Sequence, residues 1–295
     1  MTTRAGFVAL AGRPNVGKST LVNGIVGAKV AIVSDKPQTT RRAIRGVATR
    51  DDAQLVLTDL PGVQRPLDAL TDRMQRRVER ELEETDVALL VLNAEQGVGP
   101  GDRWIAGALQ RASCPVVIAV NKVDRLDRPR TVLALQAAAE LGVGEDIFPV
   151  SARTGAGIEP LADHLFGLMP ESPFLFDPQE HSDLSPYVHL AELIREQILR
   201  RTFQEVPHAV EVVVEEVEHD RDDLSVVHAR AWVETESQKG ILIGSGGKMI
   251  RAIGTAARKE LERELGTKVH LDLNVRVRRG WRGDEALLDR LGFDL

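Results

Sequence analysis

The stretch "GRPNVGKST", residues 12 to 20, has the spacing of a loop that holds phosphates. It follows the apolar run "FVALA" and precedes the helix-compatible run "STLVNGIV", which is the context that G-x-x-x-x-G-K-[ST] requires. Glycines let consecutive backbone N–H groups point at phosphate oxygens, and the helix N-terminus adds its positive end. The expected phosphate-binding residues are Gly12, Arg13, Pro14, Asn15, Val16, Gly17, Lys18, Ser19 and Thr20.

The stretch "NKVD", residues 121 to 124, follows the strand-like run "PVVIAV", and "SAR" follows a later run of the same kind. Open α/β sheets bind ligands beyond the carboxyl ends of their strands. An ionised carboxylate only accepts hydrogen bonds, so Asp124 suits the N1–H and N2–H₂ donors of guanine and repels the acceptor N1 of adenine. The backbone N–H of Ala152 is expected to reach the guanine O6. The residues expected around the base are Asn121, Lys122, Asp124, Ser151 and Ala152.

Oxygen-bearing side chains near the phosphate loop predict a Mg²⁺ site. The hydroxyl of Ser19 is expected to bind the ion directly, and Asp59 is expected to hold it through water. The polar stretch "KPQTTRR" supplies Thr40 as the preferred further ligand, with Thr39 as the alternative. The segment "DLPG" and its successor contribute Asp59, Leu60, Pro61, Gly62 and Val63, and the Gly62 N–H is expected at the γ-phosphate. The residues expected to act on that phosphate are Lys18, Thr40 and Gly62.

The composition is that of a two-domain globular protein. The chain has 295 residues, of which 43% are hydrophobic and 28% charged. Its one cysteine, Cys114, excludes an intrachain disulfide and a thiolate-built zinc site, and favours a reducing, cytoplasmic setting. The longest aliphatic runs, "VALLVL" and "PVVIAV", are too short to span a bilayer. The opening "TTRAGFVALAG" lacks the length of a signal peptide.

The elements that must position these residues divide the chain in two. Residues 1–169 alternate aliphatic strands with helical patterns, which predicts a mostly parallel α/β sheet covered on both faces. A proline-containing stretch without helical period predicts a linker over 170–186. Residues 187–295 have the order α-β-β-α-α-β. Their segment from Gln238 to Gly283 holds eleven Lys or Arg against four acids, a local charge of +7 that leaves −13 for the rest of a chain of net charge −6.

In the second part, "GSGG" lies between two expected helices. This layout resembles a type II KH domain, whose G-x-x-G loop clamps the backbone of single-stranded nucleotides. The same spacing in "GIVG" and "GWRG" lacks a flanking helix pair. The residues that the resemblance implies as RNA contacts are Lys239, Ile243, Gly244, Ser245, Gly246, Gly247, Lys248 and Arg251.

The stretches "GRPNVGKS", "QTTRR", "DLPG", "NKVD" and "SAR" resemble, in order and spacing, the G1 to G5 motifs of translation-factor-like GTPases. Together with the KH-like part, the whole chain is similar to the Era family of bacterial GTPases. The resemblance implies a P-loop GTPase domain followed by a smaller α+β KH domain, binding of GTP or GDP with Mg²⁺, and GTP hydrolysis. It also implies binding to the 3′ end of 16S rRNA and a role in assembling the 30S subunit.

Departures from the family pattern qualify these expectations. Val63 stands where Ras-type members carry a Gln that orients water, so slow intrinsic hydrolysis is expected. Ser245 and Gly246 lack the basic residue common in the loop of Era proteins, which would weaken the grip on RNA. Two alternatives remain open: a nearly non-hydrolysing assembly scaffold, and a C-terminal module that docks on proteins or on the inner face of the membrane. We expect a cytoplasmic monomer, and a solvated helix over residues 72–86.

Overall fold

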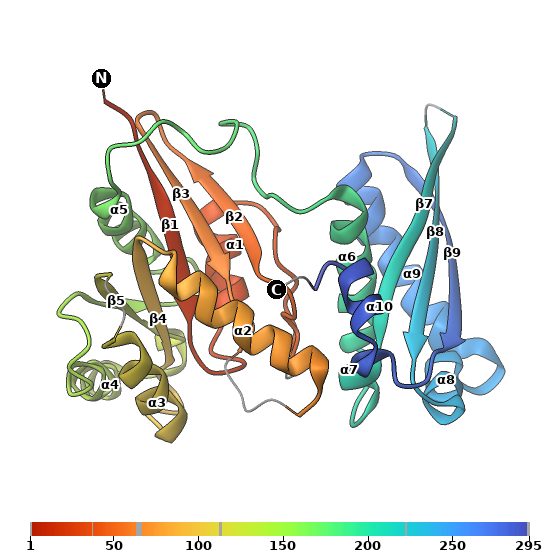
Figure 1. Ribbon diagram of the computed structural model, residues 1–295, viewed down its shortest axis with the longest axis horizontal. Coiled ribbons are helices and arrows are strands. Elements are labelled where there is room, and N and C mark those ends of the chain that lie inside the picture. Colours follow the sequence, from red (N-terminus) through yellow and green to blue (C-terminus); the bar gives the residue numbers. More distant parts are fainter. Residues whose placement is uncertain (1, 37, 63–66, 112–113, 222, 294–295) are drawn as a thin grey trace.

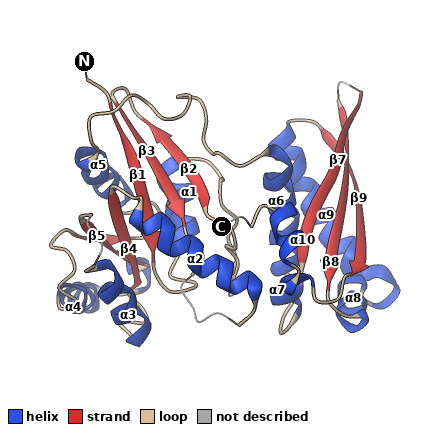
Figure 2. Ribbon diagram, in the orientation of Figure 1, coloured by secondary structure: helices blue, strands red, loops and turns tan. Residues whose placement is uncertain are grey.

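The structure is a computed structural model that describes residues 2–36, 38–62, 67–111, 114–221 and 223–293. Two units, each built of a sheet and helices, lie side by side, and the segment between α5 (Ile158–Leu168) and α6 (Pro186–Leu199) joins them at one end (Figure 1). The first unit carries the larger sheet (Figure 2). Within these described ranges, the helices are all too short or too polar to cross a membrane.

The first sheet has the strand order β2-β3-β1-β4-β5-β6 among the described residues. Its strands are parallel except that β2 runs antiparallel to β3. The central strands read as unbroken apolar runs because helices cover both of their faces. The strands are β1 (Arg4–Ala11), β2 (Ile44–Thr49), β3 (Ala53–Asp59), β4 (Val87–Asn93), β5 (Val116–Asn121) and β6 (Ile147–Val150).

The helices of the first unit divide between the two faces of this sheet. Helices α1 and α5 share an apolar cluster with β1 and β3, whereas α3 and α4 share another with β4 and β5. Helix α2 packs over Ala9 and Leu60 through Val78. The helices are α1 (Lys18–Val26), α2 (Ala69–Glu83), α3 (Pro100–Leu109), the 3₁₀ turn η1 (Val123–Arg125), α4 (Arg128–Ala139) and α5 (Ile158–Leu168).

The second unit has the predicted order α-β-β-α-α-β with short additions. Its sheet has the order β7-β8-β9, with β7 antiparallel and β9 parallel to β8. Helices α6 and α9 pack with the sheet around one apolar core. The elements are α6 (Pro186–Leu199), α7 (Val206–Ala209), β7 (Glu211–Arg221), β8 (Leu224–Val233), α8 (Glu236–Ile243), the turn η2 (Ser245–Gly247), α9 (Lys248–Leu265), β9 (Lys268–Val277), the turn η3 (Trp281–Gly283) and α10 (Glu285–Arg290).

Two features differ from the sequence analysis. The polar segment before "AQLVLTD" contains an unpredicted strand, β2, which pairs from Ile44 opposite Asp59 to Thr49 opposite Gln54. The expectation of a solvated helix over 72–86 was wrong, because α2 buries Met74 and Val78. Two charged residues of α2 are also buried: Arg73 pairs with Glu285, and Glu81 pairs with Arg45. The high charge of the sequence therefore concealed a packed face of this helix.

The segment between the units, residues 170–185, lies against the first unit. The backbone N–H of Ser172 donates to the carbonyl of Thr3 at 3.1 Å, and the backbone N–H groups of Leu175 and Phe176 donate to the side-chain oxygen of Gln54 at 2.8 and 3.0 Å. The connection is therefore fastened to the edge of the first unit over much of its length.

Candidate nucleotide site and candidate RNA interface

The loop between β1 and α1 is tightly curled and forms hydrogen bonds within itself. Gly17 has a φ of 103°, and a Cβ there would lie 2.3 Å from Nδ2 of Asn121, so the position requires glycine. The ammonium of Lys18 donates to the carbonyls of Gly12 and Arg13 at 3.0 and 3.2 Å. The start of α1 at Lys18 adds the positive end of a helix to this loop. The arrangement can present backbone N–H groups and one cation to an anion.

Three side-chain oxygens converge beside this loop. The hydroxyl of Ser19 donates to Oδ2 of Asp59 at 2.6 Å and lies 3.1 Å from Oγ1 of Thr40. Thr40 also donates to Oδ2 of Asp59, at 3.0 Å. Oδ1 of Asp59 is buried without a hydrogen-bond partner among the described residues. Hard oxygen donors around a carboxylate with spare acceptor capacity fit Mg²⁺.

The charges at this cluster oppose each other across the site. Burial raises the pKa of the Asp59 carboxyl, while the nearby ammonium of Lys18 acts in the opposite direction. Burial likewise lowers the pKa of Lys18, and the charge of Asp59 counteracts it. Each group therefore favours the ionised form of the other. The negative charge of Asp59 would also offset the charge of a bound cation.

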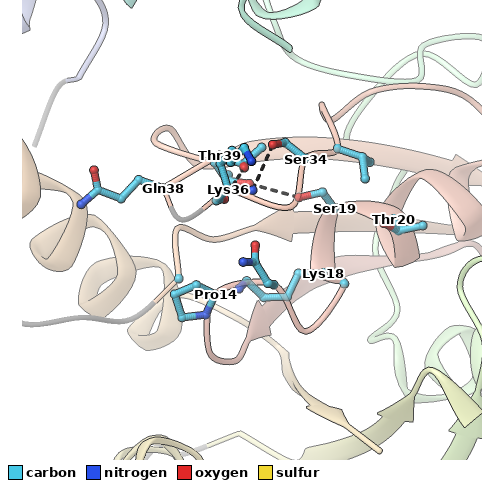
Figure 3. Close-up of a pocket in the computed structure, with 13 residues that line it drawn as sticks. Pro14, Lys18, Ser19, Thr20, Ser34, Lys36, Gln38 and Thr39 are labelled. Atoms are coloured by element: carbon cyan, nitrogen blue, oxygen red, sulfur yellow. Dashed lines mark hydrogen bonds between the residues drawn. The ribbon is translucent and has the colours of Figure 1, made fainter. Parts of the chain in front are cut away.

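The two threonines that the sequence left open point differently. The hydroxyl of Thr39 donates to the carbonyl of Lys36 at 2.6 Å, whereas that of Thr40 faces Ser19 and Asp59. Figure 3 shows Thr39 beside Lys36 on one side of the cavity, with Lys18 on the other. The cavity is lined by Pro14, Asn15, Gly17, Lys18, Ser19, Thr20, Val33, Ser34, Lys36, Gln38, Thr39, Thr40 and Gly62.

The segment after β3 closes the cavity from one side. A Cβ on Gly62 would lie 2.7 Å from Cγ of Pro14, so the backbone of Gly62 comes close to the phosphate loop. Leu60 and Val16 are fully buried and do not line the cavity. Val63, the residue on which the prediction of slow hydrolysis rests, lies outside the described residues.

The predicted base-binding residues meet at the ends of β5 and β6. Asn121 donates from Nδ2 to the carbonyl of Val16 at 2.9 Å, which ties this edge of the sheet to the phosphate loop. Lys122 reaches the carbonyl of Asn15 at 2.6 Å. The N–H of Ala152, expected to be available to the guanine O6, donates instead to Oδ1 of Asn121 at 3.0 Å. This hydrogen bond fixes the two segments relative to each other.

The Asp124 carboxylate lies in the same group and has two partners. The hydroxyl of Ser151 donates to Oδ1 at 2.6 Å, and the guanidinium of Arg153 donates to Oδ2 at 2.6 Å. The hydrogen bond from Ser151, assisted by the charge of Arg153, lowers the pKa of Asp124. The carboxylate is thus held in its ionised, acceptor-only form.

The loop between α8 and α9 presents an exposed backbone. Gly244, Gly246 and Gly247 have φ values of 71°, 59° and 75°. A Cβ on Gly244 would lie 2.7 Å from Cβ of Met249, whereas Gly246 and Gly247 have open space around them. Ser245 and Gly246 are exposed, so a ligand backbone can approach the loop closely. Gly247 also precedes the first turn of α9, whose N–H groups favour an anion.

The basic residues near this loop face more than one direction. Lys248 and Arg251 line an open groove between α6 and α9, together with Arg201 and Lys259. Lys239 and Ile243, on α8, are not among the residues that line this groove. The sequence did not indicate Arg201, because it follows the end of α6 and lies more than forty positions before the loop in the chain.

Sequence-family models match both parts of the chain. One described as a 50S ribosome-binding GTPase matches residues 7–122, and one described as a KH domain matches residues 205–282. A protein of Mycobacterium sp. (strain KMS) named GTPase Era is 47% identical over 296 residues, which cover 98% of this chain and 99% of the relative. This chain belongs to the Era family of GTPases.

Other Era proteins are similar over the same length. GTPase Era of Mycobacterium tuberculosis (strain ATCC 25177 / H37Ra) is 46% identical over 295 residues, covering 98% of each chain. A crystal structure of Era in complex with MgGDPNP and nucleotides 1506–1542 of 16S ribosomal RNA has a TM-score of 0.94 at 34% identity, covering 99% of this chain and 100% of that one. A variant of Aquifex aeolicus Era bound to GDP and AlF4⁻ has a TM-score of 0.92 at 33% identity, with the same coverage. These similarities confirm the predicted GTPase domain followed by a KH domain.

In this Era-family chain, residues outside the predicted site connect the nucleotide site to the KH unit. The side chain of Arg195 on α6 donates to the carbonyl of Thr39. Arg41 pairs with Glu211 on β7 at 2.7 Å, and Arg42 pairs with the other oxygen of Glu211 at 3.1 Å. The only sequence signal was the pair of arginines that follows the two threonines in "QTTRR".

Proposed function

We propose that this Era-family GTPase binds GTP or GDP with Mg²⁺ in the first unit, binds single-stranded 16S rRNA on the KH unit, and acts as a switch in assembly of the 30S subunit. The observation that carries the proposal is that residues 39–42 contact both units. Thr40 faces Ser19 and Asp59 in the nucleotide site, and the next residue, Arg41, is buried against Glu211 of the KH unit. The solved Era complex with MgGDPNP and a 16S rRNA segment supports the same pair of ligands for this chain.

In the proposed nucleotide site, the loop from Gly12 to Thr20 surrounds the phosphates and Lys18 reaches the β- and γ-phosphates. Ser19 and Thr40 bind Mg²⁺ directly, and Asp59 holds it through water. Their mutual distances of 2.6 to 3.1 Å support this assignment, and the contact of Thr40 with Asp59 favours it over Thr39. When bound, Mg²⁺ offsets negative charge on the phosphates.

In the proposed base site, Asp124 accepts hydrogen bonds from the N1–H and N2–H₂ groups of guanine. Asn121 and Lys122 hold the phosphate loop in place. Support for this role comes from the hydrogen bonds of Asn121 to the carbonyl of Val16 and of Lys122 to the carbonyl of Asn15. Ser151 orients the Asp124 carboxylate at 2.6 Å. The backbone N–H of Ala152 donates to the guanine O6. Its present hydrogen bond to Oδ1 of Asn121 is then either broken or shared with the base.

Hydrolysis by the isolated chain is proposed to be slow. Lys18, Thr40 and the Gly62 N–H stabilise charge on the γ-phosphate, and Val63 offers no polar group to orient water. Bound RNA or the ribosomal particle then accelerates the reaction. Multiple-turnover phosphate release with and without 30S subunits tests this, and the absence of turnover in both cases would favour a non-hydrolysing scaffold.

The switch is proposed to act through residues 39–42. A change at the γ-phosphate moves Gly62 and Thr40, and the neighbouring arginines transmit this displacement to β7 and α6. Support comes from the contacts of Arg195 with Thr39 and of Arg42 with Glu192 on α6, the latter at 3.0 Å. The nucleotide state thereby alters how the KH unit docks and how well it binds RNA.

RNA is proposed to bind along the turn between α8 and α9. The open backbone at Ser245, Gly246 and Gly247 accommodates the phosphates, and the first turn of α9 supplies N–H donors. Lys248 and Arg251 add charge from α9. The further proposed RNA contacts on α8 and its end are Lys239, Ile243 and Gly244.

We assign residues 1–169 to the GTP-binding domain, 170–186 to the linker and 187–295 to the KH domain. The chain is proposed to be a cytoplasmic monomer whose contact with the inner face of the cell membrane, where it occurs, is peripheral. Light scattering of the purified chain and flotation with anionic vesicles test both statements.

The decisive test of the proposed RNA target compares two oligonucleotides. A 16S rRNA 3′-end sequence and its scrambled version are titrated at matched salt with the GTP-analogue-bound chain, because nonspecific binding depends strongly on salt. We expect preference for the native sequence. Equal binding of both would overturn the assignment and favour a protein-docking or membrane-docking role for the KH unit.

A further inference from the structure

Both oxygens of the Asp124 carboxylate are engaged by side chains. Ser151 donates to Oδ1 and Arg153 donates to Oδ2, each at 2.6 Å. Guanine presents two donors, N1–H and N2–H₂, to a carboxylate in this position, and together they need both oxygens. Each carboxylate oxygen has two lone pairs, and Ser151 and Arg153 take one each. Arg153 therefore competes with the base for Oδ2.

The two partners of Asp124 differ in how firmly they are held. Ser151 is completely buried, and its hydroxyl also accepts a hydrogen bond from the N–H of Thr154 at 3.2 Å. The side chain of Arg153 is 71% exposed, whereas that of Asp124 is 12% exposed. An exposed ion pair is weak because water screens it and the long side chain loses freedom. Ser151 can thus stay in place while Arg153 swings out.

We propose that Arg153 determines base specificity by acting on Asp124: it neutralises the carboxylate and competes with guanine for Oδ2. Binding is then reduced by the fraction of time that Arg153 occupies Oδ2. The inference deepens the proposed guanine site and rests on the contact of Asp124 with the base. Arg153 is a positioning residue in this scheme, since it acts through Asp124.

The same geometry predicts the opposite effect for xanthine. Xanthine carries a carbonyl at C2 in place of the amino group of guanine, so it offers an acceptor where Asp124 also presents an acceptor. The guanidinium of Arg153 has donors only and lies beside Oδ2, where it can donate to that carbonyl. Arg153 therefore hinders guanine and assists xanthine.

The test is the Arg153→Ala variant of the full chain, titrated with GDP and with xanthosine diphosphate. We expect affinity for GDP to rise by up to about fivefold, through faster association, because an exposed ion pair is lost. Affinity for the xanthine nucleotide should fall, so that the selectivity ratio increases. Arg153→Lys should restore part of the wild-type ratio.

A matched control removes a charge nearby without touching the carboxylate. Arg125 lies next to Asp124 in the chain, but it pairs with Glu95 at 2.7 Å. Arg125→Ala should leave the ratio of the two affinities unchanged. A parallel fall of both affinities in Arg153→Ala would overturn the inference, because it would mean that the side chain supports the base itself.

The Asp124→Asn variant separates this inference from the site on which it rests. An amide at position 124 should reverse the preference toward the xanthine nucleotide. If Asp124→Asn keeps its preference for GDP, the proposed guanine contact fails. If the preference reverses while Arg153→Ala leaves the wild-type ratio unchanged, the role of Arg153 alone fails.

Discussion

Arg41 and Glu211 form an ion pair that is sealed between the two units. Nη1 of Arg41 lies 2.7 Å from Oε2 of Glu211, and both side chains are fully buried. The same guanidinium donates to the carbonyls of Val210 and Pro207 at 2.6 and 2.9 Å. Arg41 directly follows Thr40, so a movement of Thr40 acts on the ion pair between Arg41 and Glu211. Separating these two charges is costly, because each would then be buried without this partner.

The charge of Glu211 should make the protein sensitive to acid. Burial would raise the pKa of this carboxyl, but Arg42, Arg41 and Arg195 together lower it to about 2. A carboxyl whose pKa is lower in the folded state stabilises the fold above its unfolded value of 4.5. This contribution is lost as the pH falls from 4.5 towards about 2. Glu211→Gln should cost about 3–5 kcal/mol at neutral pH, and the difference should shrink in that acidic window.

Urea unfolding of wild type and Glu211→Gln between pH 7 and 2.5 measures this difference. Glu215→Gln is the control, since Glu215 lies on the same strand and pairs with the partly exposed Arg230 at 2.9 Å. Its effect should stay within about 1 kcal/mol at all pH values, as for other surface pairs. A pH-independent penalty in Glu211→Gln would show that the carboxylate charge does not stabilise the interface.

The two neighbouring threonines should respond very differently to truncation. Thr40→Ala removes a hydroxyl that contacts Ser19 and the Asp59 carboxylate, so Mg²⁺-dependent GTP binding should weaken by about 10- to 100-fold, the value of a charged hydrogen bond. Thr39→Ala removes a contact with the carbonyl of Lys36, which is worth about 0.5–1.5 kcal/mol. Mg²⁺ titrations of GTP binding measure both variants. A larger loss in Thr39→Ala would reverse the assignment.

Basic residues beside the glycine loop should set the salt dependence of RNA binding. Each phosphate contact to a single strand contributes about 0.7 to the slope of log K against log salt. Lys248→Ala and Arg251→Ala should each reduce the slope by about that amount. Lys268→Ala is the control, because this lysine at the start of β9 is 78% exposed and does not line the groove between α6 and α9. An equal change in the control would indicate a diffuse charge effect.

The C-terminal helix should stabilise the helix that follows the γ-phosphate segment. Leu288 on α10 is fully buried in a cluster with Leu70 and Met74 of α2 and with Trp281. Leu288→Ala should cost about 2–5 kcal/mol, because it leaves a cavity between the two units. Leu133→Ala, at a position 63% exposed on α4, should change stability by less than about 0.5 kcal/mol. Urea unfolding checks both, and similar values would show that α2 and α10 do not depend on this packing.

Features specified by neighbouring residues were predictable from the sequence. Helix α9 follows the "GSGG" loop, as predicted, and ends at Leu265 because Gly266 adopts the left-handed conformation that ends a helix. The phosphate loop and the base-binding stretch were also recognisable, since their function depends on residue types at fixed spacing after a strand. Even so, the sequence preferred Thr40 while keeping Thr39 as an alternative, because both occupy the same polar loop.

Only the tertiary structure decided how the two units are connected. Arg41 and Glu211 are 170 positions apart, so their pairing depends on how the whole chain folds. The same holds for β2, an edge strand that follows a polar loop and pairs with β3, and for α2, whose charged surface conceals Leu70 and Met74. The sequence by itself determined which chemical groups are present and their local conformation. Burial and distant partners then decided which of those groups face the nucleotide, which join the units, and why Thr40 rather than Thr39 points to Asp59.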